Sequence, residues 1–498
     1  MAITAGSNLN SVAAPQQQTL ASNYLDFTSG ANDWAQQYLP DLMEKEAEVF
    51  GQRTISGFLE KVGAEESMSS DQVVWSEQSR LHLSYVCTVD ADGDTNGTLT
   101  ITTDIDGNAI TTAAQQGHGI RTNDVVLIAQ AGVVVKALVV ETPASDVVSV
   151  EPYSAAALSE LSDGTATVLV IGSEYGKGQS YTDDTGTYKT ESRGANEPTF
   201  KSFSNKPIIM KDYYEISGSD TSAIGWVEVT GEEGQNGYLW YLKAAGDTRA
   251  RFTDYLEMSM LEAEKSVALS AIGFGADGQI RGAADAGADG AGTEGLFAAI
   301  ESRGNITSGV TGVNAATDLA EFDAILAEFD SQGAIEEYMM FVNRATSLAV
   351  DDMLASMNSY GAGGTSYGVF DNDEDMALNL GFSGFRRGSY DFYKSDFRYL
   401  NDKATRGGIN ARATSAAIRG VMIPAGVSTV YDQSLGKNLK RPFLHVRYRA
   451  SKTDSRKMKT WTTGSVGATT SALDAMQVHY LSERCLVTQG ANNFMLMK

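Results

Sequence analysis

The segment TRARFTDYLEMSMLEAEKSVALSAI, residues 248–272, decides the fold because it carries the clearest helical pattern in the chain. Apolar residues recur in it at spacings of three and four, while charged residues fill the other positions. The apolar set is Phe252, Tyr255, Leu256, Met260, Ala263, Val267 and Ala271. The set expected to face away is Asp254, Glu257, Glu262 and Lys265, and Asp247 is a suitable N-cap. A helix of this length spans about 37 Å, enough to support a whole domain.

Downstream of this helix, helical and strand patterns alternate. A glycine-dense loop at 273–295 precedes a second amphipathic helix at 318–331. A strand follows at 337–343, and Asn343 can cap a third helix that reaches about Met357. The C-terminal part is strand-like at 443–449, 476–487 and 493–497. Helices interleaved with strands that are not adjacent in sequence predict an α+β architecture.

Upstream, three kinds of segment follow one another. The first 33 residues are polar and without period, as expected of an arm that becomes ordered against a neighbour. Residues 34–59 have a helical pattern that Pro40 interrupts, and 73–85 has a strand pattern. The segment 174–205 is polar and rich in Gly, Ser, Thr and Tyr. It predicts a long hairpin that needs a partner to lie on.

Between these segments, residues 87–172 are rich in Thr, Val, Asp and Gly. Short strand patterns separated by turn residues predict a small all-β module. The expected strands are 98–103, 125–129, 133–140, 147–150 and 167–171. The most apolar stretch, 125–140, is interrupted by polar residues and glycine, so we interpret it as two strands and a turn and not as a membrane span.

Charge and cysteine usage narrow the classes of function. The 498 residues carry a formal net charge of −25, which disfavours general binding to nucleic acid. Residues 381–460 nevertheless hold 17 Lys and Arg against 5 acidic residues. This basic tract is suited to contacts between copies of the chain or to facing a polyanion. Two distant cysteines, Cys87 and Cys485, predict buried thiols and not a disulfide framework. The N-terminal 20 residues lack the pattern of a signal peptide.

No constellation of residues predicts an enzyme. The match to GxGxxG at 273–278 follows a helix, whereas a dinucleotide site needs it to follow a strand. Lys177 lies between two glycines but lacks the rest of a phosphate loop, and the four histidines have no metal-ligand spacing. We therefore predict no catalytic residues and no cofactor. A weak calcium candidate consists of Asp90, Asp92 and Asp94, with a solvated turn as the alternative, because the loop lacks the required Gly and Glu.

The order of elements resembles the major capsid proteins of tailed bacteriophages, which have the Hong-Kong-97-type (Johnson) fold. The long helix leads through Ile272-Gly273-Phe-Gly275-Ala-Asp-Gly278 to a Gly295-Leu296 step. The stretch 339–346, Met-Met-Phe-Val-Asn-Arg-Ala-Thr, matches an apolar strand followed by Asn and a helix. The C-terminal strand at 476–487 and the end at 493–496 resemble the family as well. Residues 9–15 are similar to the arm of crAss-like phages.

This resemblance implies a layout with a peripheral domain, an axial domain and an inserted all-β domain. Residues 1–40 would form the N-terminal arm, and 41–86 the start of the peripheral domain with the rising edge of the extended loop. The inserted module would be 87–172, the extended loop 173–215, and the peripheral domain with its spine helix 216–299. The axial domain would be 300–435, and residues 436–498 would return to the peripheral domain.

The resemblance also implies a function. Copies would assemble into hexamers and pentamers in the host bacterial cytoplasm and form the icosahedral head of the virion. Partners would be other copies, portal and auxiliary or decoration proteins, and packaged double-stranded DNA bound without sequence specificity, but no membrane. Candidate inter-subunit residues are Lys189, Arg193, Lys201, Arg441, Arg447 and Arg449. The alternatives are another self-assembling protein, such as a tail-tube or surface-lattice subunit, and an enzyme with a carboxylate pair.

Overall fold

The computed structural model divides the chain into two compact units. Unit 1 comprises Met1–Trp75 and Ser204–Lys498, and unit 2 comprises Ser76–Phe203. The structure describes residues 57–59, 64–78, 80–90, 97–110, 118–142, 146–154, 161–178, 200–219, 228–230, 236–266, 272–275, 277–282, 290–333, 335–357, 384–425, 427–432, 437–465 and 470–498. Within these residues, no helix combines the length and the apolar composition that crossing a membrane requires.

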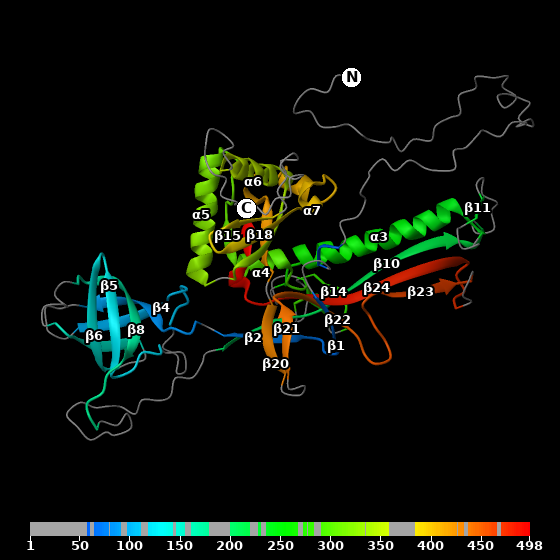
Figure 1. Cartoon of the computed structure of the whole chain (residues 1–498). Helices are drawn as coiled ribbons and strands as arrows, with labels where there is room; N and C mark the ends of the chain where they lie inside the picture. Colours follow the sequence, from blue (N-terminus) through cyan, green and yellow to red (C-terminus); the bar gives the residue numbers. More distant parts are fainter. Residues whose placement is uncertain are drawn as a thin grey trace, which may run out of the picture. The chain divides into compact units, whose positions relative to one another are not determined.

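Unit 2 is a closed antiparallel barrel of six strands in the order β3-β4-β7-β6-β5-β8 (Figure 1). The strands are β3 (Ser84–Asp90), β4 (Gly97–Asp104), β5 (Asp124–Gln130), β6 (Val133–Glu141), β7 (Val147–Pro152) and β8 (Gly164–Ser173). Alternate residues point inward, and the inward set is almost wholly apolar, with Val89, Leu99, Val126, Ile128 and Val168 fully buried. Closure leaves no unpaired strand edge in the barrel.

The five strands expected in this module all occur, each within a few residues of its predicted bounds. The stretch expected to hold two strands and a turn contains β5 and β6, joined by Ala131 and Gly132, both with positive φ. Two positive φ values favour a tight hairpin turn. The strand expected at 73–85 was wrong as a single element. It divides into β2 (Val73–Gln78) and β3, and Leu81 between them is 84% exposed.

Unit 1 contains a five-stranded sheet, called sheet A here, assembled from three distant parts of the chain. Its path is β1-β22-β24-β10, and β23 also pairs with β24. The strands are β1 (Ala64–Met68), β10 (Ile208–Ser217), β22 (Leu444–Arg449), β23 (Lys459–Gly464) and β24 (Ala475–Thr488). The 14-residue β24 is central, because ten residues of β10 pair with it in antiparallel register. β10 thus belongs to the sheet, although its residues up to 215 were predicted to lie in the extended hairpin.

Helix α3 (Leu239–Glu262) packs against sheet A. Phe252 and Leu256 form a small cluster with Tyr480 of β24, and Met260 joins the larger core, as the apolar pattern predicts. The predicted bounds were shifted, since the helix begins nine residues earlier and ends ten residues earlier. Asp247 therefore lies inside the helix instead of capping it.

The early end of α3 has a local cause. Residues 263–266 pair with the glycine-rich segment 290–295: the Ser266 N–H donates to the Ala291 carbonyl, and the Gly295 N–H donates to the Ala263 carbonyl. A Cβ at Gly295 would lie 2.8 Å from the backbone N of Ala263. Only glycine allows this approach. Immediately afterwards α4 (Leu296–Arg303) begins, at the predicted Gly295-Leu296 step.

A second, six-stranded sheet of unit 1, called sheet F here, has the order β15-β25-β19-β16-β18-β17. The strands are β15 (Asn305–Thr307), β16 (Glu337–Val342), β17 (Gly384–Arg387), β18 (Tyr390–Asp396), β19 (Gly420–Pro424) and β25 (Met495–Met497). Helices α5 (Ala315–Gln332) and α6 (Arg344–Met357) pack on it and contribute Phe322, Phe329 and Met353 to its core. Asn343 accepts a hydrogen bond from the Thr346 N–H, which confirms it as the cap of α6.

The last strand lies in a different sheet from the strands that precede it. β25 pairs with β15 and β19 in sheet F, whereas β22, β23 and β24 of the same predicted segment, 436–498, lie in sheet A. The two sheets share one apolar core. It contains Leu444 and Leu486 from sheet A together with Leu496 from sheet F and the preceding Phe494.

The remaining described elements are short. They comprise the hairpins β11–β12, β13–β14 and β20–β21, together with β2, β9, two short helices and two 3-10 turns. Their bounds are β2 (Val73–Gln78), β9 (Phe200–Asn205), β11 (Glu228–Thr230), β12 (Asn236–Tyr238), β13 (Gly273–Phe274), β14 (Ile280–Arg281), α7 (Arg398–Asn401), α8 (Arg406–Asn410), η2 (Thr414–Ala416), β20 (Val427–Asp432), β21 (Lys437–Pro442) and η3 (Ala491–Asn493). Strands β2 and β9 pair with each other, and along them the chain passes into unit 2 and out of it again. The predicted arm, most of the helix expected at 34–59 and the tip of the predicted hairpin lie outside the described residues.

Candidate functional site

The basic tract predicted to join neighbouring copies is paired within unit 1. Arg447 of β22 forms an ion pair with Glu66 of β1, with 2.7 Å between Nη2 and Oε2. Arg449 contacts Asp71 and also Glu483 of β24, the latter at 3.3 Å. Two strands remote in sequence are thereby joined by charge as well as by parallel backbone pairing. The positive charge of Arg447 and Arg449 is thus offset within the chain.

The same charge network continues across sheet A. Glu483 is only 5% exposed and also forms an ion pair with Arg456 at 2.7 Å. Arg484 lies close to Glu65 at 3.8 Å, and its burial lowers the pKa of its guanidinium. A buried charge is tolerated only when it is paired, so these contacts are part of the fold of sheet A. The excess of basic residues at 381–460 therefore does not create a free basic face at β22.

The other predicted contact residues have varied positions. Lys201 lies in β9, with its ammonium 5.6 Å from the centre of the Phe203 ring. Arg441 lies in β21 opposite Ser428 of β20. Lys189 and Arg193 lie outside the described residues, as do Asp92 and Asp94 of the calcium candidate. Asp90 is the exposed last residue of β3. In the described part of the chain, no group of three His, Cys, Asp or Glu is arranged to hold a metal ion.

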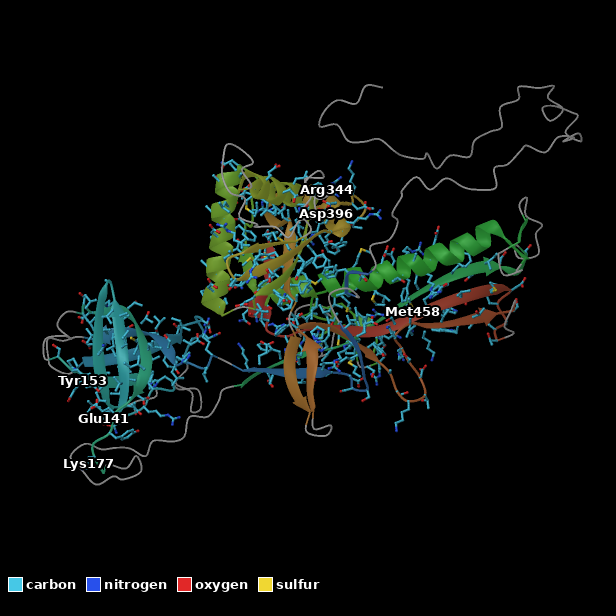
Figure 2. The ribbon with its side chains drawn as sticks, in the orientation of Figure 1. Glu141, Tyr153, Lys177, Arg344, Asp396 and Met458 are labelled. Carbon is cyan, nitrogen blue, oxygen red and sulfur yellow. The ribbon has the colours of Figure 1, made fainter. Side chains whose placement is uncertain are left out.

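The glycine motifs form turns. The match to GxGxxG at 273–278 runs from β13 toward β14, a hairpin with Gly278 at positive φ, and no helix follows it directly. Lys177 is exposed in a turn after β8, next to Gly178 at positive φ (Figure 2). His479 of β24 stacks between Trp461 and Tyr213, and its Nε2 lies 2.7 Å from the Thr463 hydroxyl. That contact suits a structural histidine.

Glu257 of α3 has a position that the helical pattern did not predict. It was expected to face away, yet it is 7% exposed and accepts from the backbone N–H groups of Gly57 and Phe58, at 2.6 and 3.2 Å. Phe58 inserts into the core against Phe341 and Phe397, with ring centres 4.7 Å apart in both cases. Burial raises the pKa of the Glu257 carboxyl. Residues 57 and 58 are therefore fixed to the C-terminal half of α3.

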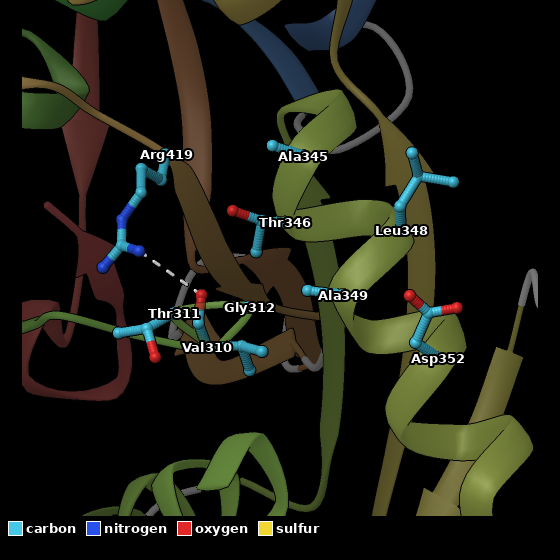
Figure 3. A pocket seen from close by; sticks show the side chains of 9 residues that line it. All are labelled: Val310, Thr311, Gly312, Ala345, Thr346, Leu348, Ala349, Asp352 and Arg419. Carbon is cyan, nitrogen blue, oxygen red and sulfur yellow. Dashed lines mark hydrogen bonds between the residues drawn. The ribbon is translucent and has the colours of Figure 1, made fainter. Parts of the chain in front are cut away.

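An open pocket of about 270 Å³ lies beside the first turns of α6 (Figure 3). It is lined by Val310, Thr311, Gly312, Ala345, Thr346, Leu348, Ala349, Asp352 and Arg419. Arg419, the residue before β19, donates to the carbonyl oxygen of Val310 at 3.4 Å and to a main-chain oxygen of Lys498, the last residue, at 3.1 Å. On the outer side of the same helix start, Arg344 forms an ion pair with Asp396 (Figure 2).

Sequence reasoning missed this pocket. Its residues come from the loop before α5, from α6 and from the start of β19, so their proximity depends on the pairing of β16 with β19. The sequence did contain the helix start at Asn343, but nothing in it pointed to Arg419.

Comparison with solved structures finds matches of low sequence identity that cover most of the chain. A chain of the mature capsid of bacteriophage PhiM1 has 9% identity and a TM-score of 0.39, covering 96% of this chain and 98% of that one. A chain of Mycobacterium phage Ogopogo has 10% identity and a TM-score of 0.38, covering 92% and 96%. A chain of the capsid of Cyanophage P-SCSP1u has 8% identity and a TM-score of 0.39, covering 96% and 98%. No family model and no curated protein matches the chain.

Proposed function

We propose that this chain is the major capsid protein of a tailed bacteriophage, a structural protein that builds the icosahedral head as hexamers and pentamers. The observation that carries the proposal is the order of elements in unit 1. The 24-residue α3 packs on sheet A, a glycine step leads to α4, and a second sheet with α5 and α6 follows before the chain returns to sheet A. This is the order that the sequence resemblance to the Hong-Kong-97-type fold implies.

Unit 1 offers edges on which copies can meet. Among the described strands, β15 and β17 are the two ends of sheet F, and β1 is one end of sheet A. Unpaired strand edges are a common place for one chain to join another. Because the arginines of β22 are paired within the chain, the contacts between copies come from such edges and from other exposed surfaces. Many modest contacts per subunit add up in a closed shell.

The barrel faces the outside of the shell in this proposal. Residues 84–173 contain 2 basic and 11 acidic residues, a formal charge of 2 − 11 = −9. A module this acidic is repelled by DNA phosphates. Packaged double-stranded DNA would lie on the inner face, and portal and auxiliary or decoration proteins would complete the head. The protein would assemble in the host bacterial cytoplasm.

The first experiment is negative-stain electron microscopy of the purified full chain, with size-exclusion chromatography of the same sample. Closed shells, or rings of five and six subunits, are expected. Tubes or flat sheets would instead favour a tail-tube or surface-lattice subunit. A monodisperse monomer at every ionic strength, also in the presence of the phage's own scaffold, would contradict the proposal.

A variant without the barrel tests whether unit 2 lies on the outer surface of the shell. Because β2 and β9 pair, residues 79–199 can be replaced by a short Gly/Ser turn that keeps both strands. Shells of unchanged diameter but a smoother outer surface are expected. The matched control removes only 88–171, which cuts β3 and β8 and exposes their apolar residues, so it should aggregate. Soluble monomers from the clean replacement would show that residues 79–199, which comprise the barrel and the predicted loop residues up to 199, make essential contacts.

A further inference from the structure

One side of the barrel's outer surface is apolar. In β5, β6 and β8, the residues that alternate with the buried core residues point outward. Leu127 of β5 lies opposite Lys136 of β6 and Leu169 of β8, so the outward residues of the three strands are neighbours. We call this surface the apolar wall, and its apolar members are Val125, Leu127, Ala129, Val134, Leu138, Val140, Leu169 and Ile171. Val134 and Ile171 are 57% and 52% exposed.

The opposite side of the barrel is polar, and the charges are distributed accordingly. Strand β4 lies across the barrel from β5 in the closed order, and the outward residues in its middle are threonines, including Thr100. The segments 125–140 and 165–171, which supply the apolar wall, contain no acidic residue, whereas 84–173 as a whole contains 11. An exposed apolar surface surrounded by polar ones typically marks a contact with another protein.

The distribution of charge favours a second barrel as the partner of the apolar wall. A polyanion is repelled by the net charge of the module, and a basic protein would be attracted to its acidic sides instead. Two copies of an acidic module also repel each other, unless the contact leaves their carboxylates outside it. The apolar wall is the side of the barrel that meets this condition, since the segments that supply it carry no carboxylate.

The edge of the apolar wall at β6 and β7 is complementary to itself. Lys136 is exposed on β6, and Glu151 points outward from β7 at the position opposite Leu138. In the part of the chain that the structure describes, neither Lys136 nor Glu151 forms an ion pair. In a contact with two-fold symmetry, each pair of residues is used twice. A two-fold axis beside Leu138 would therefore bring Lys136 of each copy to Glu151 of the other.

We propose that the apolar walls of two copies pack face to face and pair their barrels. The inference rests on the proposed function, in which a shell holds many barrels close together, and it names one contact between copies. Such a contact is weak between two free chains but gains from the high local concentration in a shell. Because shells are expected to form without residues 79–199, the pairing reinforces the shell and does not set its diameter.

Coupling between two complementary variants tests the pairing directly. Full-length Lys136→Gln and Glu151→Gln chains are mixed in equal amounts, assembled and treated with a carbodiimide, which joins an amine to a carboxylate in contact. Each chain lacks one of the two groups, so a link between Lys136 and Glu151 found by mass spectrometry must join two copies. We expect this link in the mixture, while particles of either variant alone are the control and cannot form it. Its absence from the mixture, or coupling of Lys136 only to carboxylates outside the barrel, would overturn the proposal.

The apolar part of the contact is tested separately. Leu138→Gln, introduced into both chains of the mixture, should lower the yield of the link about tenfold, because a leucine side chain loses its burial in the contact. Thr100→Gln is the matched control, since Thr100 is also half-buried but lies on β4, and it should leave the yield unchanged. Continued protection of Cys87 from iodoacetamide shows that the barrel is folded in both variants. Equal yields from the two variants would contradict the apolar contact.

The two proposals fail in different ways. If particles form but the mixture gives no link between Lys136 and Glu151, the barrels are not paired through this wall and the capsid function stands. If the full chain forms no closed shells or rings under any condition, the proposed function fails. The same coupling of the unassembled mixture at high concentration then decides the pairing, and absence of the link there overturns it as well.

Discussion

The barrel and sheet A are both sheets with apolar cores, but they are built from very different distances along the chain. Every barrel strand pairs within residues 84–173, whereas sheet A joins Ala64 to His445 and Ile208 to Arg484. Sheet A also carries a network of ion pairs between its distant strands. Local pairing costs little loop-closure entropy. The comparison indicates that the barrel is an independent folding unit, while sheet A needs almost the whole of unit 1.

The largest expected effect is confined to unit 1. Lys394 of β18 contacts Asp351 of α6, with side chains only 5% and 11% exposed, and it also donates to Ser347. Lys394→Met would leave the Asp351 charge buried without its ammonium, which typically costs about 3–5 kcal/mol. Differential scanning calorimetry should show the unit 1 transition lowered and the barrel transition unchanged. The double variant Lys394→Met, Asp351→Leu should recover most of the loss; a double variant as unstable as the single one would contradict this cause.

A somewhat smaller effect is expected for a cavity in the barrel. Ile128 is fully buried in the barrel core, and Ile128→Ala should cost about 2–4 kcal/mol. Only the barrel transition in urea should shift, because the two cores have no residues in common. Val134→Ala, at a position of neighbouring β6 that is 57% exposed, is the control and should change little. A shift of both transitions by Ile128→Ala would argue against independent folding.

Each unit contains one natural reporter of its own unfolding. Cys87 is buried in the barrel and Cys485 in sheet A, and burial raises their pKa to about 11 and about 12. Since the thiolate is the reactive form, native Cys87 should react with iodoacetamide at pH 8 about 100-fold more slowly than a free thiol. The folded state holds both protons more tightly, so stability falls as the pH rises above the ordinary value of 9.0.

Mass spectrometry of alkylated peptides along a urea gradient separates the two reporters. Cys87 should become reactive at the midpoint of the barrel, and Cys485 at the midpoint of unit 1. If Cys87 and Cys485 became reactive at the same urea concentration, both in the wild type and in Ile128→Ala, the chain would unfold as a single cooperative unit.

The smallest expected effect is at the surface of unit 2. Arg80 and Asp106 form an ion pair at 2.8 Å, but the side chains are 39% and 40% exposed. Arg80→Gln should destabilise the barrel by less than about 1 kcal/mol, and the difference should shrink further in concentrated salt. Chemical denaturation in urea at low and high salt measures it. A loss of several kcal/mol would mean that charge, and not apolar burial, holds the barrel together.

The parts of the fold that could be predicted are those set by nearby residues. Alternation and turn residues located the barrel strands, and spacing at three and four located α5, α6 and the buried face of α3 at Phe252, Leu256 and Met260. The start of α6 followed from Asn343 as its cap. Each of these patterns involves residues within one or two helical turns or within a single hairpin. Sequence patterns are most informative over such short separations.

The errors arose where distant segments decide the outcome. Tyr255 belongs to the apolar pattern of α3 but is 43% exposed, whereas Glu257 is buried because it binds the backbone at 57–58. The end of α3 depends on the glycine segment 290–295, which pairs with residues 263–266. The position of β25 in sheet F depends on its pairing with β15 and β19, which are distant in sequence. The intrachain ion pairs of Arg447 and Arg449 were not predicted, because their partners Glu66, Asp71 and Glu483 lie far from them in sequence.

The pairing of β2 with β9 also has a practical consequence for engineering. Paired strands lie about 4.8 Å apart, so the two points at which the chain departs from unit 1 and rejoins it are neighbours. A foreign domain whose own termini are close together could be inserted between Gln78 and Phe200 without distorting the pairing of β2 with β9. The same property would allow recombination to add, remove or exchange this cassette while the rest of the gene product keeps its fold.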